Sequence, residues 1–390
     1  MPSIAIIAGE ASGDLNGAML AGYLRELMPG VELWGTGCRR MREAGVDLVW
    51  ESGSSGSIGI FEALKLVPLT FVELLRVRKA LVTRRPDLLV MIDFGAFNKR
   101  LSGFARRHGI KTVYYFPPGS WRRRPRTGSS ANIADKLITP FEWSYRTLKE
   151  SGADVSLVGH PLLDVVRPSL TMTEFLDRVG YSAANDRVVA LLPGSRRQEI
   201  KHILPAILGA VKLIECRTPG IKYVVASAGE RQSKWIRQAL KRIVAGPGWP
   251  EIRVVEELTY DALAYSCLAI TTSGTATLEG AILTAPMVIV YRGSRMAHLE
   301  FALRSKVVLE DHVGLPNIFA EKRICPELIA NEASPENIAK AALELLSDSR
   351  KLSAMRQELE AVRTILGTEG GSRQASEIIV EELVKQGKQQ

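Results

Sequence analysis

The sequence predicts an α/β protein built from two parallel-sheet domains. Its 390 residues are enough for two domains that each bury a core of their own. Short apolar runs typical of buried strands alternate with helix-like patterns along the chain, as in parallel sheets joined by helical crossovers. The pattern is interrupted between His160 and Ser169, where Pro161 and Pro168 occur. We therefore expect one domain at residues 1–165 and a second at residues 166–366.

Each expected strand is a run of aliphatic and aromatic residues bounded by polar or turn-forming residues. In the first domain these runs are Ile4–Ala8, Val31–Trp34, Leu88–Ile92, Thr112–Phe116, Lys136–Ile138 and Val155–Val158. The second domain begins near Val188, and its later strands are Tyr223–Ala226, Arg253–Val255, Leu268–Thr271 and Met287–Val290. Apolar residues at helical spacing predict helices at Pro335–Leu346, about Arg350–Leu366 and Ser372–Gln386.

The composition is that of a globular protein, with 46% hydrophobic and 24% charged residues. We find no uncharged apolar run long enough to span a bilayer, and no basic-then-apolar signal-peptide pattern at the N-terminus. The four cysteines are scattered without metal-ligand spacing, which is typical of reduced cytosolic thiols. The net charge of +9 favours anionic partners, namely lipid headgroups, phosphorylated substrates or nucleic acid.

One candidate site follows the expected strand at Leu268–Thr271 and begins a helix. Unpaired backbone N–H groups and the helix dipole favour a phosphate at that helix N-terminus, which would consist of Ser273, Gly274, Thr275 and Ala276. Glu279 follows about one turn later, where a carboxylate suits the paired hydroxyls of a ribose. The alternative is an ordinary Ser/Thr helix cap.

A second strand-to-helix turn carries Arg196. The apolar run that begins at Val188 ends in Pro-Gly-Ser-Arg, and apolar residues at helical spacing follow. The Arg196 guanidinium could neutralise a diphosphate, whereas the alternative is a common turn with a solvated charge. We expect the two turns to face one another across a nucleotide site at the carboxyl ends of parallel strands.

A third strand-to-helix turn, Gly9-Glu-Ala-Ser-Gly-Asp14, follows the first expected strand. Its glycine spacing is not the dinucleotide fingerprint, and its two carboxylates would repel a pyrophosphate. Acidic and hydroxyl side chains are better suited to sugar hydroxyls. The alternative is a helix capped by Ser12 or Asp14.

These motifs, together with Leu-Pro-Gly-Ser-Arg at 192–196 and Ser-Gly-Thr-Ala-Thr-Leu-Glu at 273–279, resemble those of the lipid-A-disaccharide synthase family. Their order and approximate spacing match that family across nearly the whole chain. Further similar pieces lie at residues 93–98, 158–161, 286–288 with 291–292, and 315–317.

The resemblance implies a GT-B glycosyltransferase, in which two Rossmann-like parallel-sheet domains face a cleft. The first domain would face the acceptor and the membrane, the second would bind the UDP-sugar, and a terminal helix at about 367–390 would return to the first. It implies an inverting reaction that joins UDP-2,3-diacylglucosamine to 2,3-diacylglucosamine 1-phosphate and releases UDP, with no metal and no cofactor. By the same resemblance we assign Tyr291, Arg292 and Asn317 to the donor, and Ser12, Asn98 and Trp121 to the acceptor.

The implied location is cytoplasmic, with peripheral association with the inner membrane. The expected partners are the acylated donor and acceptor, an anionic membrane surface and, as an assembly, a homodimer. Nucleic acid is not expected.

The expected catalytic base is Asp93, at the carboxyl end of the apolar run Leu88–Ile92, where α/β active sites collect. A carboxylate there can accept the proton of a sugar hydroxyl as it attacks an anomeric carbon. Glu10 is the rival base, and an aspartate that ends a strand can also serve as a helix cap. Arg196 and the helix N-terminus at Ser273 would stabilise the departing diphosphate.

The membrane candidate runs from Ile58 to Leu75 and includes Phe61 and Leu64, with several basic residues after it. Because Pro68 divides the segment, we expect two short helices. An apolar ridge beside cations suits a headgroup layer. The alternative is a helix packed on the first sheet.

The sequence departs from the family on the acceptor side. Gly95 and Ala96 replace a proline and an acidic residue, and Tyr114 stands where the family has a histidine. Arg122, Arg123, Arg124 and Arg126 form a basic strip where the family has mostly apolar and aromatic residues. We expect this strip to contact either the acceptor phosphate or the phosphates of anionic lipids.

Three functions remain open from the residues. They are the disaccharide synthase, a related UDP-sugar glycosyltransferase or epimerase, and a catalytically silent membrane- or nucleic-acid-binding protein. The third is disfavoured, because an inert protein has no need of Asp93, Arg196 and the 273–279 turn together.

Overall fold

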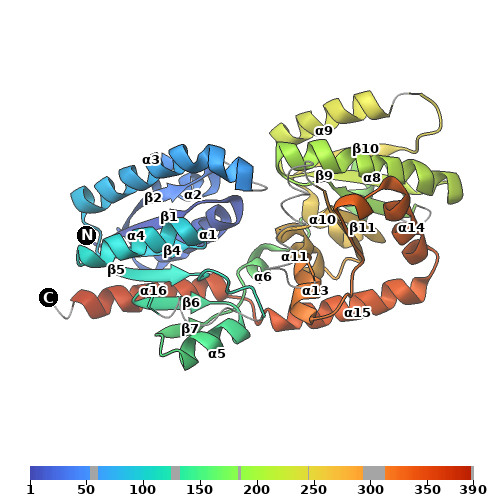
Figure 1. The fold of residues 1–390 in the computed structure, drawn as a ribbon. Helices are drawn as coiled ribbons and strands as arrows, with labels where there is room; N and C mark the ends of the chain where they lie inside the picture. Colours follow the sequence, from blue (N-terminus) through green and yellow to red (C-terminus); the bar gives the residue numbers. More distant parts are fainter. Residues whose placement is uncertain (53–59, 124–131, 183–185, 245, 293–311, 388–390) are drawn as a thin grey trace. The chain divides into compact units, whose positions relative to one another are not determined.

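In the computed structural model the chain divides into two compact α/β units (Figure 1). One unit consists of Met1–Val165 and Leu366–Gln390, and the other of Val166–Ile365. The structure describes residues 1–52, 60–123, 132–182, 186–244, 246–292 and 312–387, and of residues 60–67 it describes the backbone alone.

The first unit contains a seven-stranded sheet in the order β3-β2-β1-β4-β5-β6-β7. Every neighbouring pair is parallel, so the carboxyl ends of all seven strands lie at one edge. The strands are β1 Ser3–Ala8, β2 Glu32–Gly37, β3 Asp47–Glu51, β4 Leu88–Ile92, β5 Lys111–Tyr115, β6 Lys136–Thr139 and β7 Val155–Leu157.

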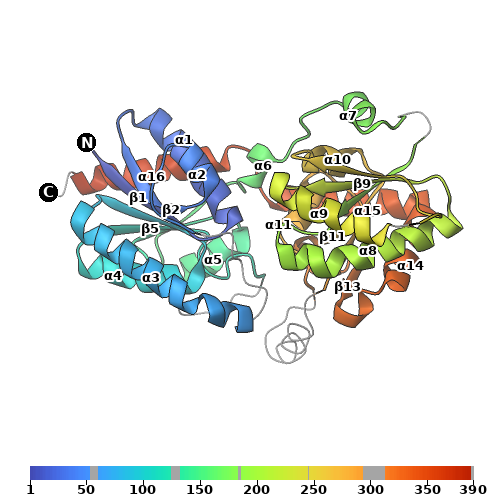
Figure 2. The same cartoon turned by 90° about the horizontal axis from the view of Figure 1, so that it is seen from above.

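Helices cover both faces of this sheet, and each face has its own apolar core. One core lies against α1 (Ala11–Leu27), α2 (Arg39–Glu43) and α16 (Gly371–Gly387), and the other against α3 (Ile60–Arg84), α4 (Gly95–Arg107) and α5 (Glu142–Glu150). Figure 2 shows α1 and α16 on one side of the sheet and α3 and α4 on the other. With both faces covered, the central strands are continuous apolar runs.

The second unit contains a six-stranded parallel sheet in the order β10-β9-β8-β11-β12-β13. Its strands are β8 Val188–Leu192, β9 Lys222–Ser227, β10 Ile252–Glu256, β11 Leu268–Thr272, β12 Met287–Tyr291 and β13 Glu327–Ile329. Its helices are α7 Met172–Val179, α8 Arg197–Arg217, α9 Glu230–Ile243, α10 Thr259–Tyr265, α11 Thr275–Ile282, α13 Leu315–Ala320, α14 Pro335–Leu346 and α15 Ser349–Ile365.

The chain leaves the first unit after α6 (Leu162–Val165) and returns to it at Leu366. The two passages are hydrogen-bonded to each other within that unit. The His160 N–H donates to the Leu366 carbonyl at 2.9 Å, and the Asp164 carboxylate accepts from the N–H groups of Gly370 and Ser372 at 2.6 and 3.1 Å. The last helix is therefore fixed to the unit in which the chain begins.

The predicted fold class is confirmed, with two local differences. The segment around Pro68 forms one helix, α3, so the prediction of two short helices was wrong. Proline removes one backbone hydrogen bond, and the rest of a helix of 25 residues remains in place. The edge strands β3 and β13 were not foreseen, because they are only partly buried, and an edge strand lacks the continuous apolar run of a central one.

Candidate functional site

Asp93 lies in a strained turn between β4 and α4. Its φ is 45° and that of Phe94 is 52°, so two consecutive residues other than glycine occupy the left-handed region. Neighbouring groups hold the turn in this conformation. The Asn98 amide donates to the carbonyls of Asp93 and Ile92 at 2.8 and 3.3 Å, and the Tyr114 hydroxyl donates to the Asp93 carbonyl at 2.7 Å. The turn therefore orients the Asp93 carboxylate at the carboxyl edge of the sheet.

The Asp93 side chain is exposed by its accessible surface, although protein atoms crowd around its carboxyl group. Partial burial, followed by the nearby Glu10 carboxylate, raises the pKa of Asp93 to about 6, and the Phe94 N–H acts in the opposite direction. A carboxyl group with this pKa is mostly ionised at neutral pH and binds a proton more strongly than an ordinary aspartate. Such a group is suited to general base catalysis.

Glu10 follows β1, the strand that pairs with β4 in the register Ala8↔Ile92. The Glu10 and Asp93 turns are therefore neighbours at the same sheet edge. A Cβ atom on Gly9 would lie 2.5 Å from the Phe94 ring, so only glycine fits between the turns. The two candidate bases thus belong to one cluster.

Asp14 has a structural role. It lies in the first turn of α1, and its buried carboxylate accepts from the N–H groups of Cys38, Arg40 and Met41 at 2.6, 3.0 and 3.1 Å. It caps α2, whereas the alternative interpretation of the sequence had Ser12 or Asp14 cap α1. Ser12 is half-buried in the first turn of α1, and Glu10 takes the cap position of that helix.

Asn98 was assigned to the acceptor, and the structure gives it a different position. Its side chain is fully buried, and its amide is occupied by the two carbonyls of the Asp93 turn. We therefore correct its role to that of a positioning residue.

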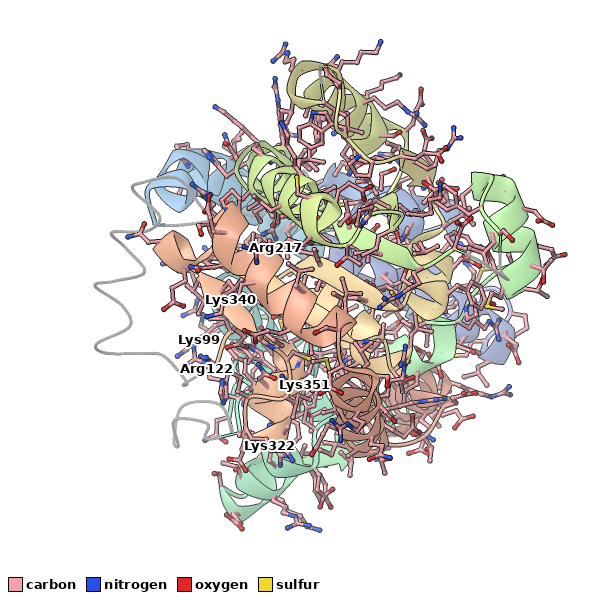
Figure 3. The ribbon with its side chains drawn as sticks, turned by 90° about the vertical axis from the view of Figure 1, so that its right-hand side faces the viewer. Lys99, Arg122, Arg217, Lys322, Lys340 and Lys351 are labelled. Carbon is pink, nitrogen blue, oxygen red and sulfur yellow. The ribbon has the colours of Figure 1, made fainter. Side chains whose placement is uncertain are left out.

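The loop after β5 carries Trp121, Arg122 and Arg123. The Arg122 guanidinium lies over the Trp121 ring at 5.0 Å, and the Arg123 guanidinium over the Trp143 ring at 4.4 Å. Figure 3 shows Arg122 and Lys99 on the same side of the first unit. Arg124 and Arg126, the rest of the predicted basic strip, lie outside the described residues.

The outer face of α3 exposes large apolar side chains. Leu69, Phe71, Val72 and Leu75 lie close together, with exposed fractions of 57, 58, 40 and 48%, and Val82, near the end of the helix, is 44% exposed. We call the first four the α3 apolar face. The side chains of Phe61 and Leu64 lie outside the described residues. The same helix also packs on the sheet through Leu74, Val77 and Leu81, so it has a core-facing side as well.

In the second unit, α11 begins at the predicted place. Its first residues are Thr275 and Ala276, with Gly274 in the cap position at a φ of 135°. Gly274 and Thr275 are exposed and Ala276 is half-buried, so this part of the helix start is open to solvent, whereas the N–H of half-buried Ser273 donates to the Val290 carbonyl at 3.2 Å. The Tyr260 hydroxyl donates to the Glu279 carboxylate at 3.3 Å. This geometry is that of a helix N-terminus open to an anion.

Arg196 occupies the cap position of α8, at the turn after β8. Glu199 accepts from the N–H groups of Ser195 and Arg196 at 2.9 and 3.1 Å, and it also lies 3.4 Å from the Arg196 guanidinium. Gly194 has a φ of 110°, and a Cβ atom there would collide with Glu199. The turn is thus built around Glu199, which holds Arg196 at the sheet edge.

Residues 312–315 form a strap that is tied to the α11 turn. The Ser273 hydroxyl donates to the Val313 carbonyl at 2.8 Å, and the Thr277 hydroxyl accepts from the Leu315 N–H at 3.3 Å. Beneath the strap, buried Glu327 accepts from the N–H groups of Val313 and Gly314 at 3.2 and 2.7 Å. Sequence reasoning missed Glu327, because an isolated glutamate in an edge strand gives no signal.

The remaining donor candidates are Asn317, Tyr291 and Arg292. Asn317 is fully buried, and its amide bonds to the backbone of Ile324 and Cys325, so it stabilises the turn after α13 and does not face a ligand. Tyr291 is half-buried at the end of β12, and the Arg292 guanidinium donates to the Ala333 carbonyl at 3.1 Å. Of these three residues, Asn317 is therefore corrected to a structural role.

Comparison with known proteins gives a family match over nearly the whole chain. The model of a family described as "Lipid-A-disaccharide synthetase" matches residues 4–383. A lipid-A-disaccharide synthase of Geobacter sulfurreducens is 36% identical over 384 residues, covering 98% of each chain.

Solved structures show the same fold at low identity. The glycotransferase of kitacinnamycin has a TM-score of 0.64 at 14% identity, covering 98% of this chain and all of its own. A UDP-GlcNAc 2-epimerase of Neisseria meningitidis, bound to UDP-GlcNAc, has a TM-score of 0.61 at 13% identity, covering 99% of this chain and all of its own. Together with the two parallel sheets, these similarities identify the GT-B fold class.

Proposed function

This chain belongs to the lipid-A-disaccharide synthetase family and is a glycosyltransferase, and we propose how its residues perform the reaction. The reaction joins UDP-2,3-diacylglucosamine to 2,3-diacylglucosamine 1-phosphate, and its products are lipid A disaccharide 1-phosphate and UDP. We assign acceptor activation to the first unit and UDP binding to the second.

Asp93 is the general base. It accepts the proton of the acceptor hydroxyl while the hydroxyl oxygen bonds to the anomeric carbon of the donor. The bond between that carbon and the diphosphate oxygen breaks, and UDP leaves with the electron pair. Attack on the face opposite the leaving group inverts the anomeric centre. The observation that carries this assignment is the strained Asp93 turn, in which the carboxyl pKa is raised to about 6.

Glu10 is the second carboxylate of this cluster, and its charge helps to raise the pKa of Asp93. Ser12, half-buried in the first turn of α1, is proposed to contact the acceptor sugar.

The second unit binds UDP. At the α11 helix start, the N–H groups of residues 274–276 and the Thr275 hydroxyl donate to the diphosphate, and Arg196 neutralises its charge as UDP leaves. Ser273 positions this turn, because its N–H and hydroxyl donate to the Val290 and Val313 carbonyls. Glu279 accepts hydrogen bonds from the ribose hydroxyls, and Tyr291 and Arg292 lie at the end of the neighbouring strand β12. The accessible Gly274 and Thr275 support this assignment, because an anion can approach their backbone.

The first unit binds the membrane surface through the α3 apolar face. Four exposed apolar side chains on one helix, followed by Arg76, Arg78 and Lys79, suit the boundary between acyl chains and anionic headgroups. Among the helices that the structure describes, none is both long enough and apolar enough to cross a bilayer. The protein is proposed to be a peripheral membrane protein on the cytoplasmic side, and a homodimer stays a prediction.

The test is release of UDP from the diacylated donor, with and without the monophosphate acceptor, in detergent micelles. We expect UDP to appear only when both substrates are present, together with one disaccharide product per UDP. Equal UDP release without acceptor, or a change of sugar configuration in the donor alone, would contradict the proposal and favour an epimerase.

A further inference from the structure

We propose that Arg122 and Arg123 form a binding site for a phosphate monoester, the 1-phosphate of the acceptor sugar. The inference rests on the proposed function. It extends that function by naming the side chains that recognise the phosphate of the acceptor. It is carried by the placement of these two arginines in the first unit and by how their guanidinium groups are held.

The loop that carries the arginines packs directly on the Asp93 turn. A Cβ atom on Gly95 would lie in ordinary contact, 3.4 Å, with the Cβ of Pro118, so the start of α4 touches this loop. The strands before the two segments are paired as Ile92↔Tyr115, and the Asp93 N–H donates to the Tyr115 carbonyl at 3.1 Å. A ligand held by the loop would therefore lie beside the proposed base.

Each guanidinium lies against an indole ring. Arg122 stacks on Trp121 and Arg123 on Trp143, at 5.0 and 4.4 Å from the ring centroids. The ring of Trp143 is itself fixed, because its Nε1 donates to the Ser120 carbonyl at 2.9 Å and Phe141 stacks on it at 4.9 Å. A planar guanidinium with one face covered presents its N–H edge, which is the geometry that binds phosphate in a bidentate manner.

The local charge also favours a phosphate. Within the part of the chain that the structure describes, Arg122 forms no ion pair with a carboxylate. Lys99, in the first turns of α4, adds a third cation on this side of the unit (Figure 3). A phosphate monoester carries a charge of about −1.5 to −2 at pH 7 and three acceptor oxygens, so it matches two adjacent arginines.

The experiment compares the binding of two acceptors by the wild type and by variants of the protein in detergent micelles. The acceptors are 2,3-diacylglucosamine 1-phosphate and the same lipid without its phosphate. The proteins are the wild type, the double variant Arg122→Ala with Arg123→Ala, and the matched control Arg107→Ala. Arg107 is an exposed arginine at the C-terminal end of α4. It lies about 18 Å along that helix from Gly95, the residue that contacts the arginine loop.

We expect the wild type and Arg107→Ala to bind the phosphorylated acceptor about 10- to 100-fold more tightly than the other lipid, as loss of charge-assisted hydrogen bonds implies. The double variant should lose this preference while its UDP affinity stays unchanged. A second double variant, Arg122→Lys with Arg123→Lys, should keep part of the preference, because lysine keeps the charge and loses the bidentate edge. Calorimetry of acceptor binding gives these values independently of turnover.

A double alanine variant that still prefers the phosphorylated acceptor by the wild-type factor would overturn the proposal. The proposal would also be overturned if the double alanine variant kept its preference for the phosphorylated acceptor but bound phosphatidylglycerol vesicles more weakly. The arginines would then contact lipid headgroups instead of the acceptor. If the wild type binds the phosphorylated acceptor preferentially but releases no UDP, the proposed reaction fails and the phosphate site stands.

Discussion

The turn that carries Asp93 and the turn at Gly274 occupy equivalent places in the two units, and they are built in opposite ways. Each connects a central strand to a helix at the carboxyl edge of a parallel sheet. The first holds two residues with side chains in the left-handed region, whereas the second uses a glycine at a φ of 135°. The first presents a carboxylate, and the second presents backbone N–H groups flanked by Ser273 and Thr275.

The difference follows from what each turn has to do. A base must be held in one orientation, and side chains in the left-handed region are tolerated only where neighbours such as Asn98 and Tyr114 enforce the conformation. An anion site requires the ligand to approach the backbone closely, which favours glycine and small hydroxyl residues. The first turn thus suits the proposed proton transfer, and the second suits the proposed binding of phosphate.

The largest expected effect comes from a substitution in the Asp93 turn that should abolish proton transfer and leave UDP binding intact. Asp93→Asn keeps the size of the side chain and cannot accept the proton, so turnover should fall by about two to four orders of magnitude. UDP affinity should not change, because UDP is assigned to the other unit. The measurement is steady-state kinetics with both substrates, paired with UDP calorimetry. If Glu10→Gln loses activity and Asp93→Asn does not, the roles of the two carboxylates are exchanged.

The second largest expected effect is a loss of UDP affinity from substitutions in the α11 turn. Thr275→Val and Glu279→Ala should each weaken UDP binding by about 1.5–3 kcal/mol, since each removes a hydrogen bond to or from a charged group. Calorimetry with UDP measures this. Thr284→Val is a matched control for Thr275→Val, because Thr284 follows α11 at its other end. Wild-type affinity in both site variants would remove the UDP site from this turn.

The pH profile tests the environment of Asp93. Its folded pKa of about 6 means that the base is protonated below this value, so kcat/KM should fall about tenfold per pH unit there. Since Glu10 contributes to the raised pKa, Glu10→Gln should shift the acid limb to lower pH. An acid limb that stays in place in Glu10→Gln would show that burial alone sets the pKa.

The smallest effect is on stability. The raised pKa means that the folded state binds a proton at Asp93 more tightly than the unfolded state does. The resulting stabilisation is full below the unfolded pKa of about 4 and is lost as the pH rises through about 6. Asp93→Asn should therefore be more stable than the wild type at pH 8, by at most about 1 kcal/mol because solvent screens the open face, and not at pH 3. Thermal unfolding at the two pH values measures the difference.

The sequence predicted the sheets and the positions of both turns, because buried central strands and strand-to-helix junctions have strong local patterns. It did not predict which polar residues in the motifs face a ligand. Asp14, Asn98 and Asn317 have the residue types of a binding site, yet their side chains bond to backbone groups brought close only by the fold. Glu327 shows the converse, since a residue outside every motif supports the α11 turn through long-range contacts.

Helix α16 has a consequence for how the protein is made. It supplies Ala375, Ile379 and Leu383 to the core beside α1, so the unit whose synthesis begins first is the last to be completed. The 200 residues from 166 to 365 are translated in between, which takes about 10–40 s at about 5–20 residues per second. During that interval the face of the nascent first sheet that carries α1 and α2 still lacks α16, its third covering helix. Part of this sheet face therefore stays open to chaperones until the second unit has been translated and α16 has been made.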